Sequence, residues 1–373
     1  MIKFIVTIGT NKYKKDNRYY AVSVKNKVEY LIEKLNEMDY RLEIVSCAPS
    51  KNTFGFLPRR KEDFNGNVLI NTPTFCFPTR LGQKIQKLLI YIWLFFYLVF
   101  NTNRNEDIIV YHQYNPIIKL AQKIKKFNII LEVEEIYSDL TGNKTKRKKE
   151  MQYIKNASKY IVASEKINNL IGNLNKPYCI FNGRYDVFKK TNSAFNDGKI
   201  HIVYAGSIYY NLVAFTSVEI AKYLSDKYVI HIIGWGLDKD INLLKTRIAE
   251  INKTAKCRVE YNGMLSGNRL SEFLQSCHIG ISPQRTDEEF ANACFPSKLS
   301  LYLSNGLRVV ASYSRAVEES ILGSLIDFSP SSDPIEFAKE IQSLNLNDKY
   351  DSMKMIKNLD ARFYDDLYNF MRE

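Results

Sequence analysis

The sequence predicts an α/β protein with two doubly wound domains, and three observations support this prediction. Apolar, β-branched runs alternate with amphipathic stretches along almost the whole chain, which is typical of βαβ units in a parallel sheet. The alternation occurs twice, on either side of a polar, turn-rich stretch at residues 181–201 that lacks periodicity. The chain also has 373 residues, which is more than one hydrophobic core usually holds.

The first half of the chain opens with the strand-like run "MIKFIVTIG" and continues as alternating strands and helices. Short apolar runs predict strands near residues 2–8, 41–46, 67–70, 107–112, 128–133, 158–163 and 178–181. Apolar residues at helical spacing predict helices near residues 22–38, 82–100, 116–126, 144–156 and 166–173.

The second half repeats this pattern. Strands are predicted near residues 200–205, 228–233, 258–262, 278–282, 307–311 and 325–328. Helices are predicted near residues 213–225, 240–252, 267–276, 296–305, 333–343 and 347–372. We expect an N-terminal domain at 1–183, a linker at 184–198, a second domain at 199–345, and a C-terminal helix at 346–373 that crosses back.

The charge of the chain is uneven. The net charge is +13, but residues 1–150 hold 26 Lys and Arg against 15 Asp and Glu, whereas the remaining residues hold 27 against 25. A basic bias that is confined to one half indicates that this half faces an anionic surface. A nucleic-acid-binding protein would show basic residues interleaved with exposed aromatics along one groove, and we find no such module.

Cysteine usage and the N-terminus indicate a cytoplasmic protein. The six cysteines are scattered and form no Cys-x-x-Cys pair, so we expect reduced thiols. The first residues lack a signal-peptide pattern. The triplet at residues 238–240, Asp-Lys-Asp, is predicted to begin a solvated helix rather than to bind a metal. We therefore expect no metal and no cofactor.

Ligands of doubly wound sheets bind beyond the carboxyl ends of the strands, where this sequence places glycines and small polar residues. We expect the first strand of the second domain to end at Ala205, so that Gly206 and Ser207 form a turn whose N–H groups approach a phosphate. The dipeptides Gly234-Trp235 and Asn262-Gly263 follow the next two strands and are further donor-binding candidates. The alternative for each is an ordinary turn.

The stretch "FPSKLSLYLSNGLRVVAS", residues 295–312, predicts a short helix that leads into a buried strand. Pro296 suits the first helical position, with Ser297 next, and Gly306 suits the left-handed end of the helix. Lys298 is unusual, because a cation in the first turn meets the positive end of the helix dipole. We interpret Lys298 as a point charge for a phosphate; the alternative is a surface lysine that extends into solvent.

Blocks of the second half carry a resemblance to a known family. In order over residues 200–312 they are "VYAGSI", "AKYLSDKYVIHIIGWG", "VEYNGML", "LSEFLQSCHIGISPQ" and "FPSKLSLYLSNGLRVVAS". They resemble the nucleotide-sugar domain of GT-B glycosyltransferases, close to glycosyltransferase family 4, and "FNGRYDVF" (181–188) resembles that family's linker. The first domain is similar in layout only. The resemblance implies two Rossmann-like domains that face a cleft and bind a nucleoside-diphosphate sugar.

The chain also departs from the usual pattern of this family. Aligned on Phe295 and Gly306, the two glutamates usual in the family are replaced by Ala293 and Leu301. A subset of bacterial polysaccharide glucosyl- and galactofuranosyltransferases resembles this chain instead, with Pro-x-Lys-Leu-Ser-Leu-Tyr-Leu and no glutamate. In that subset, the resemblance implies that the lysine corresponding to Lys298 takes the diphosphate role.

The first domain is expected to bind the acceptor. One strand ends near His112, and the next ends at Glu134 and Glu135, with Tyr137 following. A carboxylate beside an acceptor hydroxyl can act as a general base, so Glu134 or Glu135 is the catalytic candidate and His112 is a further one. The alternative is that a glutamate pairs with a basic loop or caps a helix.

The loop "GTNKYKKDNRYY", residues 9–20, follows the first strand and is also expected to border the acceptor site. Gly9, Thr10 and Tyr137 are therefore our acceptor-binding candidates. The loop contains no Gly-Lys-Ser/Thr, which excludes a P-loop.

A possible membrane contact is indicated by "LLIYIWLFFYLVF", residues 88–100. A bilayer-spanning helix needs ~20 apolar residues, so this run is too short, but it is apolar all round, unlike a helix that covers one face of a sheet. Basic residues precede it, and residues 54–61 and 144–149 add basic stretches in the same domain. We interpret these as a peripheral patch for an anionic leaflet; the alternative is an internal helix.

These observations predict a glycosyltransferase whose donor is a nucleoside-diphosphate sugar, with UDP favoured over GDP as the nucleotide. The predicted acceptor is a lipid-linked glycan in surface polysaccharide assembly. The protein is expected to act at the inner face of the cell membrane. The alternative is a catalytically degenerate protein that binds or scaffolds another transferase, because both family glutamates are missing. The sugar, the linkage, the stereochemical outcome and the oligomeric state stay open.

Overall fold

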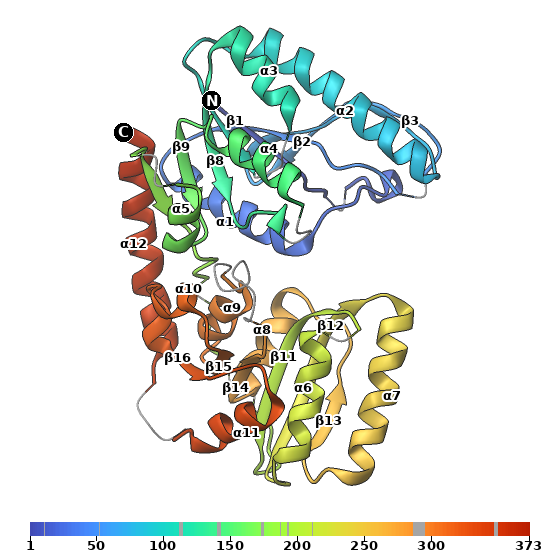
Figure 1. Ribbon diagram of the computed structural model, residues 1–373, viewed down its shortest axis with the longest axis vertical. Coiled ribbons are helices and arrows are strands. Elements are labelled where there is room, and N and C mark those ends of the chain that lie inside the picture. The colour runs from blue at the N-terminus through green and yellow to red at the C-terminus, as the bar shows by residue number, and fades with distance from the viewer. Residues whose placement is uncertain are drawn as a thin grey trace. The chain divides into compact units, whose positions relative to one another are not determined.

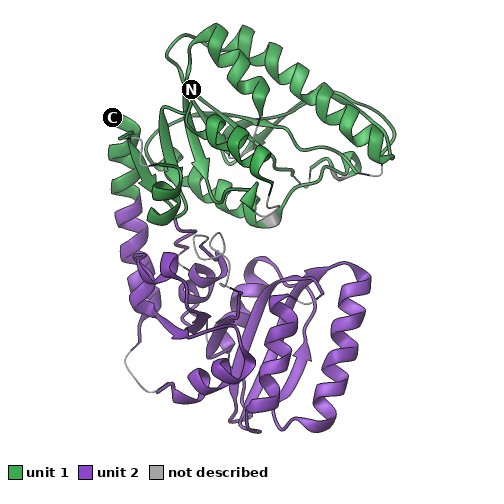
Figure 2. Cartoon of the chain, in the orientation of Figure 1, with its two compact units in different colours: residues 1–181, 364–373 green, residues 182–363 purple. Residues whose placement is uncertain are grey.

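Figure 1 shows the computed structural model, which describes residues 1–373 except 11, 52, 112–114, 140–142, 173–174, 187, 192–193, 211, 286–294 and 347–349. The chain divides into two compact units, which Figure 2 draws in different colours. Unit 1 contains residues 1–181 and 364–373, and unit 2 contains residues 182–363. The residues that precede the first strand of unit 2, 182–199, belong to that unit.

The described residues of unit 1 form an eight-stranded sheet with the order β10-β9-β8-β7-β1-β2-β5-β4. Strands β1, β7 and β8, in the middle of the sheet, bury almost every side chain, as expected for a parallel sheet that is covered on both faces. The bounds are β1 (Ile2–Val6), β2 (Leu42–Ser46), β4 (Arg60–Phe64), β5 (Asn67–Asn71), β7 (Asp107–Tyr111), β8 (Asn128–Val133), β9 (Lys159–Val162) and β10 (Tyr178–Ile180).

Three strands of unit 1 were not predicted. Strand β4 pairs antiparallel with β5, so the sheet is mixed at this edge rather than purely parallel. Strands β3 (Gly55–Leu57) and β6 (Thr74–Cys76) form a separate antiparallel pair. The reason they escape the sequence is physical: β3 and β6 are three residues long, and β4 is the charged run RKEDF at a sheet edge, so none shows a sustained apolar pattern.

Four helices of unit 1 begin where the sequence supplies a capping side chain, whereas α1 follows Ala21 without one. Thr79 caps α2, Asn115 caps α3, Asn143 caps α4 and Ser164 caps α5, each by accepting a hydrogen bond from a first-turn N–H group. The helices are α1 (Val22–Glu37), α2 (Arg80–Asn101), α3 (Pro116–Lys125), α4 (Lys144–Ile154) and α5 (Glu165–Leu170), with a 3₁₀ turn, η1 (Lys14–Asp16).

The described residues of unit 2 form a six-stranded, fully parallel sheet with the order β13-β12-β11-β14-β15-β16. The sheet and the helices α6, α7 and α11 enclose a core of apolar side chains that are almost completely buried. The strands are β11 (Ile200–Ile208), β12 (Tyr228–Gly236), β13 (Arg258–Tyr261), β14 (Ile279–Ser282), β15 (Arg308–Ser312) and β16 (Ile326–Ser329).

The predicted helices of unit 2 are present, but those predicted near 240–252, 296–305 and 347–372 begin at Asp238, Lys298 and Ser352, and the short helix at 315–318 was not predicted. Asp238 and Asp240 lie in the first turn of α7, where Asp238 is exposed as expected but Asp240 is buried. The helices are α6 (Val213–Ile220), α7 (Asp238–Thr254), α8 (Gly267–Ser276), α9 (Lys298–Ser304), α10 (Arg315–Glu318), α11 (Pro334–Ser343) and α12 (Ser352–Arg372), with 3₁₀ turns η3 (Ala221–Tyr223) and η4 (Gly323–Leu325). Residues 352–363 of α12 belong to unit 2 and residues 364–373 to unit 1 (Figure 2).

The prediction that Pro296 opens the helix was wrong. Helix α9 begins at Lys298 and is seven residues long, and Ser297 precedes it without a side-chain capping bond. Its end agrees with the sequence, because Gly306 has the positive φ of +83°. The buried Tyr302 holds α9 in place: its hydroxyl accepts from Ala205 N–H at 2.8 Å and donates to Ile281 O at 3.3 Å.

Candidate functional site

The predicted turn at Gly206 is instead part of a strand. Strands β11 and β12 stay paired as far as Ile208 and Gly236, so the ladder continues through Gly206-Ser207 and Gly234-Trp235. A Cβ atom at Gly234 would lie 1.7 Å from Gly206 O, so only glycine allows this close approach. The prediction of a turn at Gly206 was therefore wrong. The pairing of β11 with β12 continues beyond the apolar run from which the strand was predicted.

The structure does bring Gly206, Tyr204 and Lys298 together. A Cβ atom at Gly206 would lie 2.8 Å from the Tyr204 hydroxyl, and Lys298 Nζ lies 4.8 Å from the centre of the Tyr204 ring. The Tyr204 hydroxyl donates to Ser207 O at 2.9 Å. Tyr204 is not among the predicted site residues, because it lies within the strand rather than in a loop.

Lys298 is an incompletely compensated cation. Burial lowers its pKa from 10.5 to about 8, and no carboxylate in the described part of the chain forms an ion pair with it. The Tyr204 ring offers only a cation–π contact. A bound anion would compensate the charge, which is the chemistry that a diphosphate supplies. Because α9 is short, the lysine itself rather than the helix end is the main candidate for this role.

The other donor-binding candidates lie around the same strand ends. Gly234 N–H donates to Gly263 O at 2.9 Å, which joins the loop after β13 to β12. Trp235 is 40% exposed and makes an edge contact with Tyr209 at 6.3 Å. Asn262 is partly buried and contacts His231 Nδ1 through its Oδ1 at 3.1 Å.

The segment before α9 is open to solvent on one side. Ser297 is exposed and Pro296 is partly exposed. Ser297 O accepts a hydrogen bond from Ser300 Oγ at 3.0 Å, and a Cβ atom at Gly183 would lie 2.8 Å from that same Oγ. The segment that carries Gly183 therefore packs directly against the first turn of α9.

An open groove of about 1280 Å³ lies elsewhere in unit 2. Its lining includes Tyr210, Arg285 and Tyr313, together with Arg247, which pairs with Glu219 and Glu250. None of the donor-binding candidates lines this groove. It is therefore separate from the site around Lys298.

In unit 1 the two candidates for the general base, Glu134 and Glu135, follow the carboxyl end of β8. Glu134 forms an ion pair at 2.5 Å with the buried Lys27, which lies on helix α1 rather than in a basic loop. Burial alone would lower the pKa of Lys27, but the facing glutamates, Glu134 first, outweigh burial and raise it. The ion pair holds the Glu134 carboxylate against Lys27.

Tyr137 lies beside the same acidic group. Its backbone N–H donates to Glu150 Oε1 at 3.0 Å, and burial together with Glu134 raises the pKa of its hydroxyl. Tyr137 therefore stays a neutral hydrogen-bonding group at physiological pH. His112 lies outside the described residues, so its place in the site stays a prediction.

Gly9 and Thr10 line a small cavity of about 170 Å³ after β1, together with Arg18 and Tyr20. Thr10 Oγ1 donates to Glu62 at 2.9 Å. Neither Glu134 nor Tyr137 lines this cavity, so the structure does not gather all of the acceptor-binding candidates into one cavity. Within the described ranges, no group of His, Cys, Asp and Glu side chains is arranged to hold a metal ion.

Comparison with known proteins identifies the fold. No protein-family model and no curated protein matches the sequence. A UDP-forming α,α-trehalose-phosphate synthase from Burkholderia xenovorans, solved with glucose-6-phosphate, superposes with a TM-score of 0.72 at 11% identity and covers 100% of this chain and 99% of its own. HepE from Anabaena, solved with UDP, has a TM-score of 0.68 at 11% identity and coverages of 100% and 97%. The chain has the GT-B fold.

The GT-B fold confirms the fold class predicted from the sequence. A further match with this fold is AviGT4, a glycosyltransferase involved in avilamycin A biosynthesis, with a TM-score of 0.54 at 11% identity and coverages of 99% and 98%. A trehalose-6-phosphate protein from E. coli, solved with UDP-2-fluoro glucose, has a TM-score of 0.68 at 10% identity and coverages of 98% and 97%. At these identities the likeness shows the GT-B fold alone.

Proposed function

We propose that this protein is a glycosyltransferase that uses a UDP-sugar as donor. The observation that carries the proposal is Lys298, a partly buried cation that lacks a carboxylate partner within the described residues and lies at the strand ends of unit 2. The GT-B fold supports it, because solved proteins with this fold include ones bound to UDP and UDP-2-fluoro glucose. Lys298 would stabilise the negative charge that develops on the diphosphate leaving group.

The acceptor side of this proposal assigns general-base catalysis to Glu134 or Glu135. The transferred group, a hexosyl or a galactofuranosyl unit, is not distinguished by these residues.

We further propose that the acceptor is a lipid-linked glycan at the inner face of the cell membrane. Helix α2 supports this, because only 28% of its most apolar window is buried, and by length and composition it could even cross a membrane. Its buried side is Gln86, Ile90, Leu94 and Leu98. The opposite side is an exposed apolar stripe, which we call the α2 stripe: Leu81, Ile85, Leu88, Ile92, Phe96 and Phe100.

The surroundings of the α2 stripe extend this apolar surface. Helix α3 packs beside α2 (Figure 1) and adds the exposed Leu120 and Ile124. Phe56 and Phe75, on the β3–β6 pair, are at least half exposed. The exposed basic side chains Arg80, Lys84, Lys87 and Lys123 accompany them. An apolar stripe with flanking cations fits a helix that lies in the plane of an anionic leaflet.

A non-catalytic alternative stays open, because Leu301 occupies one of the two positions at which the resembled family carries a glutamate, and the other, Ala293, lies outside the described residues. The test is calorimetric titration of the full chain with UDP, GDP and UDP-sugars, followed by an assay for UDP release in the presence of a lipid-linked acceptor. UDP binding with turnover supports the transferase, UDP binding without turnover supports the scaffold, and absence of UDP binding contradicts the transferase.

A further inference from the structure

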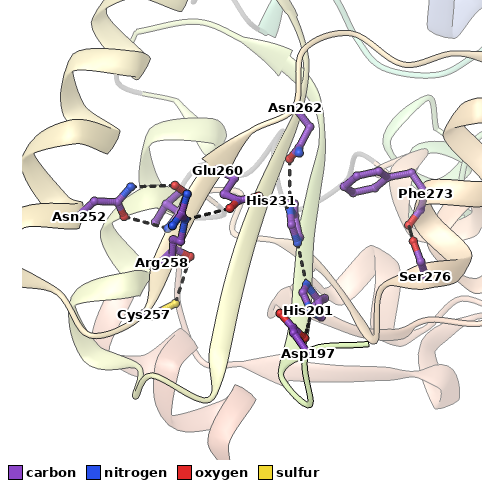
Figure 3. Close-up of polar contacts among 11 residues, drawn as sticks. Asp197, His201, His231, Asn252, Cys257, Arg258, Glu260, Asn262, Phe273 and Ser276 are labelled. Carbon is purple, nitrogen blue, oxygen red and sulfur yellow. Dashed lines mark hydrogen bonds and ion pairs between the residues drawn. The ribbon is translucent and has the colours of Figure 1, made fainter. Parts of the chain in front are cut away.

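Four side chains of unit 2 form one continuous line of contacts, Asp197–His201–His231–Asn262, which we call the histidine relay (Figure 3). His201 Nε2 lies 2.9 Å from Asp197 Oδ1, and His201 Nδ1 lies 2.8 Å from His231 Nε2. His231 Nδ1 lies 3.1 Å from Asn262 Oδ1. The Asp197 side chain is 48% exposed, both imidazoles are only 2% exposed, and Asn262 follows β13 at the carboxyl edge of the sheet.

The relay needs more N–H groups than two neutral imidazoles possess. The Asp197 carboxylate and Asn262 Oδ1 can only accept, and the two rings also share a hydrogen bond. Three hydrogen bonds therefore require three ring N–H groups, whereas two neutral rings carry two. With Asn262 Oδ1 facing His231, one ring is therefore an imidazolium, and His201, the ring that contacts the carboxylate, is the one whose charge is compensated.

The groups that face His231 agree with this assignment. Glu260 Oε2 lies 3.7 Å from His231 Nδ1, so two acceptors face that nitrogen and favour a proton on it. Arg258 pairs with the other oxygen of Glu260 at 2.9 Å. Phe273 meets the His231 ring edge-on. Burial lowers the pKa of His231, consistent with a neutral ring.

The groups that face His201 agree as well. Phe195 stacks on the ring at a centroid distance of 3.8 Å, which suits a cation over an aromatic face. The contact with His201 is the main cause that lowers the pKa of the Asp197 carboxyl, and Lys199 N–H, which donates to it at 3.1 Å, lowers it further. His278 Nδ1 accepts from the His201 backbone N–H at 3.0 Å, so neutral His278 carries its proton on Nε2. Burial is the main cause that lowers the pKa of His278.

The relay has one further arrangement that satisfies every hydrogen bond, and it holds one proton fewer. If the Asn262 amide turns over, its Nδ2 donates to His231 Nδ1, His231 Nε2 donates to His201 Nδ1, and His201 Nε2 donates to Asp197. Both rings are then neutral. Loss of one proton to solvent through the exposed Asp197 end is therefore linked to reversal of the Asn262 amide.

We propose that the histidine relay positions Asn262 as a hydrogen-bond donor to an oxygen atom of the nucleotide sugar. In the protonated relay, Oδ1 faces His231 and Nδ2 is left to a ligand; within the described residues Nδ2 makes no hydrogen bond. The bond from Gly234 N–H to Gly263 O holds the neighbouring backbone. In the neutral relay, Asn262 presents an acceptor instead. This inference rests on the proposed donor role of unit 2; His201 and His231 are positioning residues.

The ring protonation can be read directly, because the chain has only four histidines. In the full chain labelled with ¹⁵N-histidine, NMR should show His201 as an imidazolium, His231 as the Nδ1–H tautomer and His278 as the Nε2–H tautomer. On raising the pH, the relay should lose one proton and His231 should change to the Nε2–H tautomer in the same step. His231 in the Nε2–H form while His201 is cationic, or two neutral rings at every pH, would overturn the inference.

Two variants sharpen this measurement. Asn262→Asp offers only acceptor atoms, so the tautomer change of His231 should move to higher pH, by about 1 unit for a nearby carboxylate. Asn242→Asp, the same substitution at an exposed site on α7, should leave the step unchanged. An unchanged step in Asn262→Asp would contradict the link between the amide and the proton.

The ligand readout is the ratio of UDP affinities of the wild type and Asn262→Ala, measured by calorimetry across the same step. The ratio cancels the pH dependence of all other groups. We expect it to fall about fivefold, the value of one neutral hydrogen bond, as the relay loses its proton. A constant ratio would overturn the role of the relay at the donor. If no UDP binds at all, the proposed function itself fails, whereas the ring spectra still decide the relay.

Discussion

Replacing Lys298 with Met separates the cost of its charge from the packing of its side chain. Methionine keeps an unbranched apolar stem that can pack on the Tyr204 ring, but it carries no charge. If Lys298 binds an anion, Lys298→Met should be more stable than the wild type in the absence of ligand. With UDP bound, Lys298→Met should be less stable than the wild type.

The size of the effect follows from the pKa. Burial lowers the pKa of Lys298 from 10.5 to about 8, a shift that corresponds to roughly 3 kcal/mol. The side chain is only partly buried, so solvent screening reduces this to roughly 1–2 kcal/mol. At pH 7 we expect Lys298→Met to raise Tm by about 2–8 °C, since 1 kcal/mol corresponds to about 2–4 °C in a unit of this size.

Proton binding by Lys298 determines how the free energy of unfolding changes with pH. Between pH 8 and 10.5 the unfolded state binds more protons at Lys298 than the folded state, so the free energy of unfolding of the wild type should rise with pH across this window. The advantage of Lys298→Met should therefore shrink from pH 8 and disappear near 10.5. The matched control is Lys239→Met, also in the first turn of a helix but exposed, for which we expect no such difference.

Measurement of UDP binding tests the assignment of Lys298 to the diphosphate. A charged hydrogen bond to phosphate is worth ~1.5–3 kcal/mol, so Lys298→Met should bind UDP about 10- to 150-fold more weakly. Calorimetry at pH 8, in buffers of different ionisation enthalpy, should show uptake of ~0.5 proton by the wild type, because half of the lysines are neutral before binding. Unchanged affinity together with no proton uptake would refute the assignment of Lys298 to the diphosphate.

Three further predictions address other parts of the molecule. Ile92→Glu and Phe96→Glu, both on the exposed α2 stripe, should each reduce flotation with anionic vesicles at least ~10-fold without lowering Tm, and equal flotation with neutral vesicles would contradict an electrostatic contribution. Either Glu134→Gln or Glu135→Gln should lower turnover ~100- to 10,000-fold while UDP affinity is kept, and near-normal turnover of both variants would place the base elsewhere. Tyr302→Phe should lower the free energy of unfolding by ~1–3 kcal/mol in denaturant, because buried Ala205 N–H loses its acceptor.

Much of the fold was predictable from local pattern. The strands at the centre of both sheets are continuous apolar runs, and capping residues such as Thr79, Asn115 and Asn143 mark helix starts in the sequence. The edge strand β4 was not predictable in the same way. Its residues RKEDF bury only alternate positions, and the strand exists because β5 offers it a partner.

The candidate site was predictable in part. Lys298 was found because its charge is unfavourable where the local sequence places it, and that conflict is visible without a structure. The length of β11 was not visible, because Gly206 is a poor strand former that stays extended only through pairing with Gly234. The α2 stripe was predictable in part. The sequence indicated an excess of apolar residues in this helix, but only the structure showed which of them are exposed.

The sequence alone determined the alternation of strands and helices, the GT-B layout and the presence of a lysine that lacks local charge compensation, because each of these depends on residues close together in the chain. Tertiary structure alone decided that His201, His231 and Asn262, each about thirty residues from the next, form one hydrogen-bonded line. Neighbouring strands of a parallel sheet bring such residues into contact through their register, and the proton count of the relay follows from that contact and not from any local pattern.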